Sequence, residues 1–210
     1  ALKAVPSKTT MPILECILMD ATTNQIKFTT NDMELGIETI VEGTIEEKGK
    51  VALDAKIFYE IIRRLPDNDV TIKTDDKYAA TITCEKAKFN IPGKSGEDFA
   101  YLPMIEKDEP LTISQYTLKE MIRQTIFSIA VNENNKLMTG ELFEIKNNCL
   151  KVVSLDGHRI SIRKMSLKKD YSDRKVVVPG KTLSEISKIL SGEVDDQVSI
   201  YFTKNHILFE

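Results

Sequence analysis

The chain has 210 residues, of which 41% are hydrophobic and 29% charged, and its formal net charge at neutral pH is −3. This composition is typical of an ordinary globular protein with room for two domains, and no apolar run approaches the roughly 18 residues of a membrane span. The acidic balance excludes a general attraction to nucleic acid, so any contact with DNA must depend on local placement of basic residues.

The cysteines and the absence of a visible signal peptide favour a cytoplasmic protein. Cys16, Cys84 and Cys149 lie far apart and are odd in number. We therefore expect reduced thiols rather than a disulfide framework or a zinc site.

The first half of the chain predicts a mixed α and β domain. One helix follows Asp54 as its N-cap, and Pro66 ends it. Within it, Ile57, Ile61 and Leu65 have the i, i+4, i+8 spacing of a buried stripe. Alternating and β-branched runs predict strands over 14–20, 25–30, 34–45, 70–73, 79–84 and 88–91, and a proline-flanked linker follows over 103–110.

The second half predicts the same kind of domain. A helix is expected from the N-cap Ser114 to Ala130, and a last helix has Pro179 in its first turn. Strands are expected over 140–145, 150–154, 159–165, 175–178, 198–202 and 207–209. The apolar stripe of the Ser114 helix consists of Leu118, Met121, Ile122, Thr125, Ile126 and Ile129.

Two segments of the chain occur twice, in the same order. VALDAKIFYEIIRRL at 51–65 returns as VVVPGKTLSEISKIL at 176–190, an offset of 125, and IKFTTNDMELGI from Ile26 returns as LKVVSLDGHRIS from Leu150, an offset of 124. Solenoid repeats are shorter, about 20 to 50 residues, so we predict two copies of one α+β domain, 1–109 and 110–210. Each copy should have two helices packed on antiparallel sheets. Unmatched segments at both ends indicate that the first copy lacks its N-terminal strand and most of its first helix, and the second copy its last strands.

Basic residues recur on the repeated helix, at Lys56, Arg63, Arg64, Lys181 and Lys188. A single helix with such residues usually has no more than a solvated face, and nearby glutamates partly neutralise this one. However, Lys56 returns as Lys181 in a chain that is acidic overall. This recurrence favours a surface that follows phosphates without reading bases.

Motifs that would indicate an enzyme are incomplete. The triplet Gly180-Lys181-Thr182 resembles the end of a phosphate-binding loop, but Lys175 stands where the first glycine belongs, and Pro179 lacks an N–H. The histidines, His158 and His206, belong to no catalytic or metal-binding pattern. We therefore expect no catalysis, no cofactor and no metal.

The segment 155–160, LDGHRI, contains an Asp-Gly turn, and without other signals it would be an ordinary exposed hairpin. Following the strand GELFEI at 140–145, however, it resembles the second domain of the bacterial DNA polymerase III beta subunit family, the sliding clamps. Other segments resemble the same family in order along the chain: 8–14, 30–34, 91–93 with 98–99, and 177–181.

This resemblance implies a ring. Members of the family have three copies of the domain per subunit and pair head to tail, so the chain would cover domains one and two, with the third absent. Duplex DNA passes through the ring without being read in sequence, and the clamp tethers the polymerase without catalysis. The implied partners are double-stranded DNA, the DNA polymerase III alpha subunit, the clamp loader, other polymerases and repair proteins with clamp-binding peptides, and a second copy of the full-length protein. No membrane is implied.

The resemblance also implies two sets of site residues. Those expected to face DNA are Lys8, Lys56, Arg63, Asn132 and Lys181. Those expected to line one wall of a hydrophobic peptide-binding groove are Met138, Leu155, Gly157, His158, Arg159 and Ile160. The chain departs from the family at Leu155, often a small hydroxyl residue, and at Lys136 and Leu137, where many relatives have tyrosines.

Two alternatives belong to other classes. A stand-alone interaction scaffold of duplicated α+β domains would share the repeat but would not encircle DNA. A nucleotide-dependent enzyme would need the phosphate-binding loop that Lys175 and Pro179 interrupt.

Overall fold

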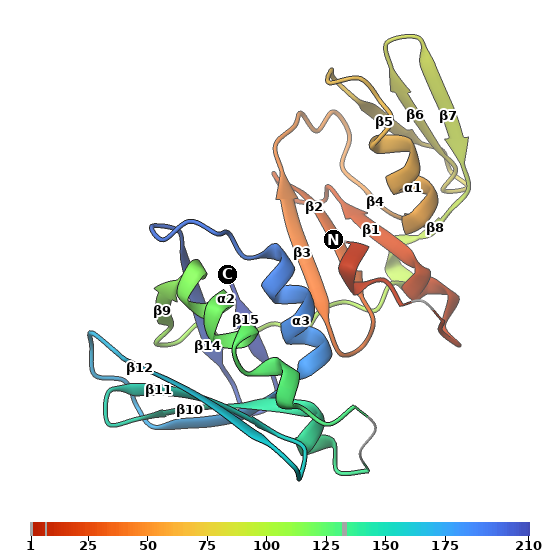
Figure 1. Ribbon diagram of the computed structural model, residues 1–210. Helices are drawn as coiled ribbons and strands as arrows, with labels where there is room; N and C mark the ends of the chain where they lie inside the picture. Colours follow the sequence, from red (N-terminus) through yellow and green to blue (C-terminus); the bar gives the residue numbers. More distant parts are fainter. Residues whose placement is uncertain (1, 7, 132–133) are drawn as a thin grey trace. The chain divides into compact units, whose positions relative to one another are not determined.

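The structure, a computed structural model, describes residues 2–6, 8–131 and 134–210. The chain divides into two units, Ala1–Pro103 and Met104–Glu210 (Figure 1). This division lies at the start of the predicted linker over 103–110. Each unit has its own sheets and its own hydrophobic core, and each is described separately below.

Unit 1 has two antiparallel sheets and the helix α1 (Ala55–Ile62). The larger sheet has the order β3-β2-β1-β4-β8, formed by Gly36–Val41, Ile26–Asn31, Cys16–Asp20, Lys50–Asp54 and Gly93–Ser95. The smaller has the order β5-β6-β7, formed by Thr71–Thr74, Ala80–Cys84 and Ala87–Ile91. Short 3-10 helices are η1 (Leu2–Ala4), η2 (Pro12–Glu15) and η3 (Gly96–Asp98).

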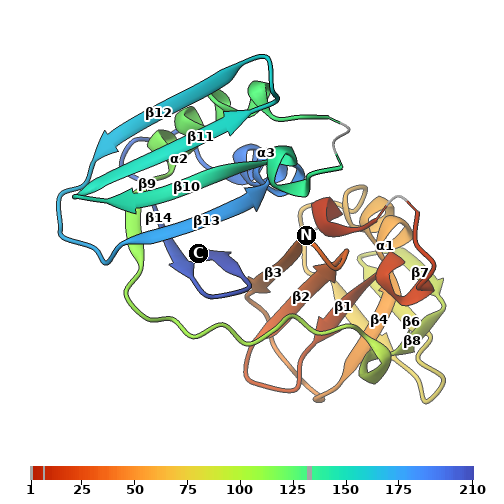
Figure 2. The same ribbon diagram turned by 90° about the horizontal axis from the view of Figure 1, so that it is seen from below.

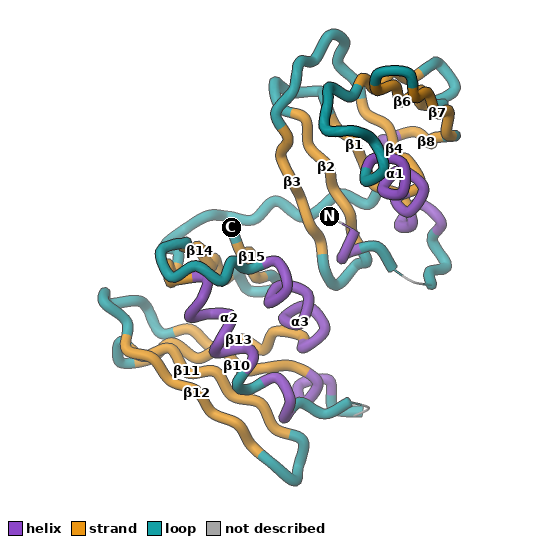
Figure 3. Tube along the Cα trace, turned by 45° about the horizontal axis from the view of Figure 1, so that its top comes forward, coloured by secondary structure: helices purple, strands orange, loops and turns teal. Residues whose placement is uncertain are grey.

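Unit 2 has the helices α2 (Gln115–Arg123) and α3 (Gly180–Ile189) on one face of a four-stranded sheet (Figure 2). This sheet has the order β12-β11-β10-β13, formed by Ile160–Ser166, Cys149–Leu155, Gly140–Lys146 and Arg174–Pro179. A second sheet has the order β15-β14-β9, formed by Ile207–Phe209, Gln197–Phe202 and Leu111–Ser114. The 3-10 helices η4 (Ile126–Ser128) and η5 (Lys136–Thr139) connect α2 to β10 (Figure 3).

Strand register confirms that the repeat seen in the sequence is a structural duplication. The orders β3-β2-β1-β4 and β12-β11-β10-β13 correspond strand by strand. Leu18 pairs with Thr29, and 124 residues later Leu142 pairs with Val153. The same offset relates η1 to η4 and η2 to η5. The fold is therefore α+β, with helices packed on antiparallel sheets in duplicated units, as predicted.

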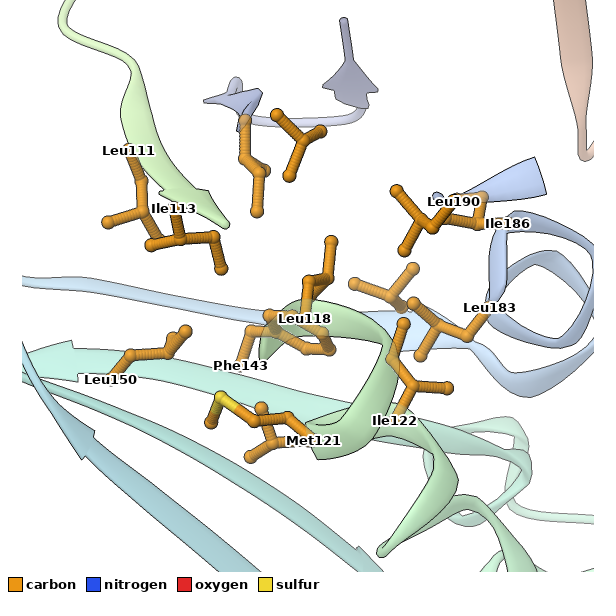
Figure 4. Close-up of a cluster of buried hydrophobic side chains, with 14 of the residues drawn as sticks. Leu111, Ile113, Leu118, Met121, Ile122, Phe143, Leu150, Leu183, Ile186 and Leu190 are labelled. Atoms are coloured by element: carbon orange, nitrogen blue, oxygen red, sulfur yellow. The ribbon is translucent and has the colours of Figure 1, made fainter. Parts of the chain in front are cut away.

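The core of unit 2 lies between its two helices and its sheets (Figure 4). The stripe predicted for α2 is confirmed, because Leu118, Met121 and Ile122 are buried. They meet Leu183 from α3 and Phe143 from β10. Burying each such side chain contributes about 1.5–3 kcal/mol, so these contacts hold the helices on the sheet.

The core of unit 1 corrects the predicted stripe of its helix. Asp54 caps α1 as expected, since its Oδ1 accepts from the Ile57 N–H at 2.8 Å. The Ile57 side chain, however, is 47% exposed. The buried positions of α1 are Ala55 and Phe58, and the Phe58 ring stacks on Phe28 with centroids 5.7 Å apart. Ile61 and Leu65 of the predicted stripe are half-buried and pack against this core, so the predicted stripe is wrong at Ile57 alone.

Helix ends and short strands also differ from the prediction. The Ser114 helix ends at Arg123 instead of Ala130, because Thr125 Oγ1 donates to Met121 O at 2.7 Å and the chain continues as the 3-10 helix η4. Pro179 was expected in the first turn of the last helix, but it is the N-cap, so α3 begins one residue later, at Gly180. The strands β4, β8 and β9 were not predicted. None of the helices in the described part of the chain is long and apolar enough to span a bilayer.

Candidate peptide-binding surface and nucleic-acid interface

The hairpin between β11 and β12 is held by Asp156. Its Oδ1 accepts from the N–H groups of His158 and Arg159, both at 3.1 Å, and its Oδ2 accepts from Arg159 Nε at 2.9 Å. The hydrogen bonds from the His158 N–H and then from Arg159 hold the pKa of Asp156 below its ordinary value. The carboxylate thus fixes the turn that presents the exposed His158 and Arg159 side chains.

Gly157 has a structural reason to be glycine at this turn. Its φ is +87°, a backbone conformation that side-chain-bearing residues rarely adopt, and no atom lies within 4 Å of where a Cβ would stand. The requirement is therefore one of backbone conformation and not of space.

The apolar members of the predicted groove wall meet across the same hairpin. Leu155 and Ile160 are direct cross-strand partners, and they are 37% and 59% exposed. Two further exposed residues lie on the same outer face of the sheet, Ile162 on β12 and Val177 on β13. Sequence reasoning did not name Ile162 or Val177 as site residues. Ile162 lies two residues after Ile160 on β12 and therefore shares its face, and the strand register places Val177 on that face through its pairing with Leu142. Together these side chains form an apolar patch that is unusual for a solvated sheet face.

Met138 lies on η5, where it is half-buried. Its carbonyl oxygen accepts from the Ala130 N–H at 2.8 Å, so the segment after η4 is tied to η5. In turn, η4 is tied to the hairpin strands, since Ser128 Oγ and Ser161 Oγ are 2.6 Å apart. Met138 and the hairpin therefore belong to one hydrogen-bonded assembly within unit 2, joined through η4 and not by a direct contact that we observe.

The lysines predicted to face DNA occupy equivalent places in the two units. Lys56 is the second residue of α1 and Lys181 the second residue of α3, and both are exposed. Lys8 is exposed in the segment between η1 and η2. Within the described residues, neither Lys8 nor Lys56 forms an ion pair. The predicted Asn132 lies outside the described residues.

Arg63 differs from the lysines because its charge has an internal partner. Its Nε donates to Glu60 Oε2 at 3.1 Å, and its guanidinium lies 5.6 Å from the centre of the Tyr59 ring. Arg64 reaches the same carboxylate at 3.0 Å. Similar pairing occurs on α2, where Glu120 accepts two hydrogen bonds from Arg123. The helices therefore present partly compensated positive charge instead of a strong field.

A hollow on unit 1 explains the exposure of Ile57. It has a volume of about 310 Å³ and lies between α1 and β7, with Ile57, Ile61 and Phe89 as its apolar lining and Lys56, Glu60 and Arg64 at its edge. No group of three or more His, Cys, Asp or Glu side chains within residues 2–6, 8–131 and 134–210 is arranged to hold a metal ion.

Comparisons with known proteins agree with this architecture. A family model for the N-terminal domain of the DNA polymerase III beta subunit matches residues 1–103, and a model for the central domain matches residues 112–210. A protein named beta sliding clamp from Staphylococcus epidermidis is 33% identical over 216 residues, covering 99% of this chain and 57% of the relative. The chain thus spans a little over half the length of the curated relatives that it matches.

Solved structures match over nearly the whole chain. A crystal structure described as a DNA polymerase III beta subunit from Eubacterium rectale is 68% identical with a TM-score of 0.97, over 99% of this chain and 57% of that one. The DNA polymerase sliding clamp of Bacillus subtilis is 35% identical with a TM-score of 0.95, over 100% and 57%. A Pseudomonas aeruginosa sliding clamp, 25% identical with a TM-score of 0.85 over 97% and 56%, was solved bound to griselimycin. With both of its units matched by family models and its fold shared with these relatives, the chain belongs to the DNA polymerase III beta subunit family.

Proposed function

We propose that the full-length protein is a DNA sliding clamp, a non-catalytic processivity factor that encircles duplex DNA and tethers the replicative polymerase. The observation that supports this most directly is the duplication itself. The two units have the same strand register, and each carries a lysine as the second residue of its equivalent helix, Lys56 and Lys181. In a ring built from repeated domains, such lysines would recur along the inner surface.

The electrostatics of the helices suit a protein that slides. Each phosphate contact made by a lysine adds a salt-dependent, sequence-independent increment of affinity. Arg63 and Arg123 are already paired with glutamates, which reduces the positive charge that their helices present to phosphates. Contacts from Lys8, Lys56 and Lys181 would then be weak and mobile, so that retention on DNA depends on ring closure.

The hairpin and η5 of unit 2 supply one wall of a groove for short hydrophobic peptides. The apolar surface comes from Met138, Leu155 and Ile160, and polar anchors come from His158 and Arg159. Such a mixture of apolar area and a few polar groups is typical of peptide recognition. The partners we propose for this groove are the DNA polymerase III alpha subunit, the clamp loader, and other polymerases and repair proteins.

Charge reversal tests the DNA-facing role. In the full-length protein, Lys8→Glu, Lys56→Glu and Lys181→Glu together should shorten the products of a polymerase on primed circular DNA without changing the mass of the assembled ring. A matched control reverses three exposed lysines with no assigned role, Lys86, Lys168 and Lys204. Equal processivity of the two triple variants would contradict the inner-face assignment.

Retention on DNA tests ring closure. A full-length dimer that remains on circular DNA and leaves linear DNA through its ends would support encirclement. A protein that shows no preference for circular templates would instead be an interaction scaffold.

Alanine substitutions test the groove. Met138→Ala and His158→Ala should each weaken binding of a QxLxLF-type peptide by about 1–2 kcal/mol, roughly five- to thirtyfold in Kd. Val194→Ala, at another exposed apolar residue of unit 2, is the control. Unchanged affinity of the first two variants would place the groove elsewhere.

A further inference from the structure

A row of polar side chains crosses the core face of the four-stranded sheet of unit 2, beneath η4. Ser154 pairs with Ser161, and Glu141 pairs with Val178. The register that pairs Leu142 with Val153 places Glu141 opposite Ser154. Above this row, Ser154 Oγ donates to the Thr125 carbonyl oxygen, and Ser128 meets Ser161. The segment that follows α2 is thus attached to the sheet by polar contacts.

Glu141 is the charged residue of this row, and its side chain is 0% exposed. Neither carboxyl oxygen accepts a hydrogen bond from a donor among the described residues. The nearby Thr125 hydroxyl already donates its hydrogen to Met121 O at 2.7 Å, so its oxygen is left as an acceptor. A carboxylate here would be buried without compensation, whereas a protonated carboxyl has an O–H to donate.

The surroundings favour the protonated form. Burial raises the pKa of Glu141 to about 7. Lys151 and Lys175 lie on the opposite face of the sheet, where they pair with Glu144. The other charged groups on the elements packed against this face are Lys119, Glu120 and Arg123 on α2, Lys136 on η5, Arg163 on β12, Arg174 on β13, and Lys181, Glu185 and Lys188 on α3. Among these described groups, none contributes to the shift of Glu141.

The row lies on the core face of the same strands whose outer face carries Leu155 and Ile160 of the proposed groove wall. One step along the register from the Ser154–Ser161 pair is the Leu155–Ile160 pair. At its other end, the η4 segment is joined to Met138 through the Ala130 N–H. The position of η4 on the polar row therefore helps to set the position of Met138 relative to the β11–β12 hairpin.

We propose that Glu141 is a positioning residue for peptide binding: its protonated carboxyl group donates a hydrogen bond to Thr125 Oγ1 and holds η4 on the sheet, so that Met138 and the hairpin form one wall. This inference rests on the proposed peptide-binding function. Ionisation of Glu141 releases η4, because the carboxylate has no proton to donate and gains from contact with water. The wall is then misaligned, and the affinity for peptide falls.

The test compares Glu141→Gln with the wild type in the full-length protein, with a fluorescent QxLxLF-type peptide as the probe. Glutamine has the same size, keeps an N–H donor and does not ionise. The control is Glu144→Gln, which removes one carboxylate from the opposite face of the same strand. Every variant retains His158, so any contribution of that residue is common to the three proteins and cancels in the comparison.

Between pH 6 and pH 8.5 we expect the affinity of the wild type and of Glu144→Gln to fall severalfold relative to the affinity of Glu141→Gln. A Glu141→Gln variant that loses affinity in parallel with the wild type would overturn the proposal. The proposal would also be overturned if the ratio of the wild-type affinity to the Glu141→Gln affinity were the same at pH 6 and at pH 8.5.

Amide hydrogen exchange separates this inference from the proposed function. Protection of the Ser128 and Ala130 amides, which donate to Thr125 O at 3.0 Å and to Met138 O at 2.8 Å, should fall with rising pH in the wild type but not in Glu141→Gln. If no variant binds peptide at any pH, the proposed peptide groove is wrong, and the exchange data still decide whether Glu141 holds η4. Equal protection in both proteins would refute that role.

Discussion

Gly157→Ala is the substitution with the clearest expected effect on the hairpin of unit 2. At φ +87° an alanine is strained, and no neighbouring atom would meet the new methyl group. The left-handed region costs a residue with a Cβ about 1–2 kcal/mol. Steric clashes contribute nothing, so the backbone strain is the whole folded-state effect.

Gly192→Ala is the matched control, because Gly192 also faces open space but has no left-handed φ. Both substitutions remove the same freedom from the unfolded chain, which stabilises the folded state by about 0.4–1 kcal/mol. This gain cancels between the two variants, and their difference isolates the strain. Gly157→Ala should therefore be less stable than Gly192→Ala by about 1–2 kcal/mol.

Equilibrium urea unfolding of the full-length protein, followed by far-UV circular dichroism, measures this difference. With a slope of about 2 kcal/mol per M, the midpoints of the transition that includes the hairpin should differ by about 0.5–1 M. Strain in Gly157→Ala should also move the His158 N–H away from Asp156, so the peptide affinity of this variant should fall below that of Gly192→Ala. Equal midpoints would show that the left-handed conformation of residue 157 is not required.

Three further predictions concern buried and charged groups of unit 2. The pKa of Glu141 is about 7 when folded against an ordinary 4.5, so its contribution to stability is complete below pH 4.5 and is lost as the pH rises through 7. Relative to Glu141→Gln, the wild type should lose about 3 kcal/mol between pH 4.5 and pH 8.5 in urea unfolding, and parallel pH profiles would contradict this. Asp156 has the opposite sign: its pKa is lowered, so its contribution is present above its ordinary value of 3.8 and is lost as the pH falls through the folded pKa. The amide NMR signals of its hairpin should shift in that acid range in the wild type but not in Asp156→Asn. Leu118→Ala, at a side chain with 0% exposure, should destabilise unit 2 by about 2–5 kcal/mol; a loss below 1 kcal/mol in urea unfolding would mean that α2 does not anchor the core.

Local patterns in the sequence were sufficient for much of this fold. The cap at Asp54, the buried stripe of α2 and the hairpin at Asp156 were predicted, because each depends on residues close together in the chain. The duplication was predicted from the similarity of segments about 124 residues apart. The resemblance to the clamp family was confirmed by the family models and by the solved relatives. The roles of the DNA-facing and peptide-binding residues stay predictions.

Other features depend on contacts between distant residues, which periodicity does not contain. The strand β9 exists because its residues pair with β14, more than 80 positions later, where Ser114 meets Gln197. Ile57 has helical spacing suited to burial, but the sheet of unit 1 takes up Phe58, and Ile57 is left beside the hollow against β7. The partner surface, and not the helix, selects which apolar residues are covered.

Glu141 shows most clearly what the sequence pattern determines and what the tertiary contacts determine. Its alternation with Phe143 and Ile145 along β10 places it on the core face, a signal that is present in the sequence. A charged residue at such a position would ordinarily be expected at an edge that water can reach. The segment that contains η4, held by Ser154 and Ser161 from elsewhere in the chain, covers the carboxyl group, and this burial raises its pKa. Sequence order thus specifies which face of a strand a side chain occupies, whereas packing determines the dielectric environment it meets there and therefore its charge.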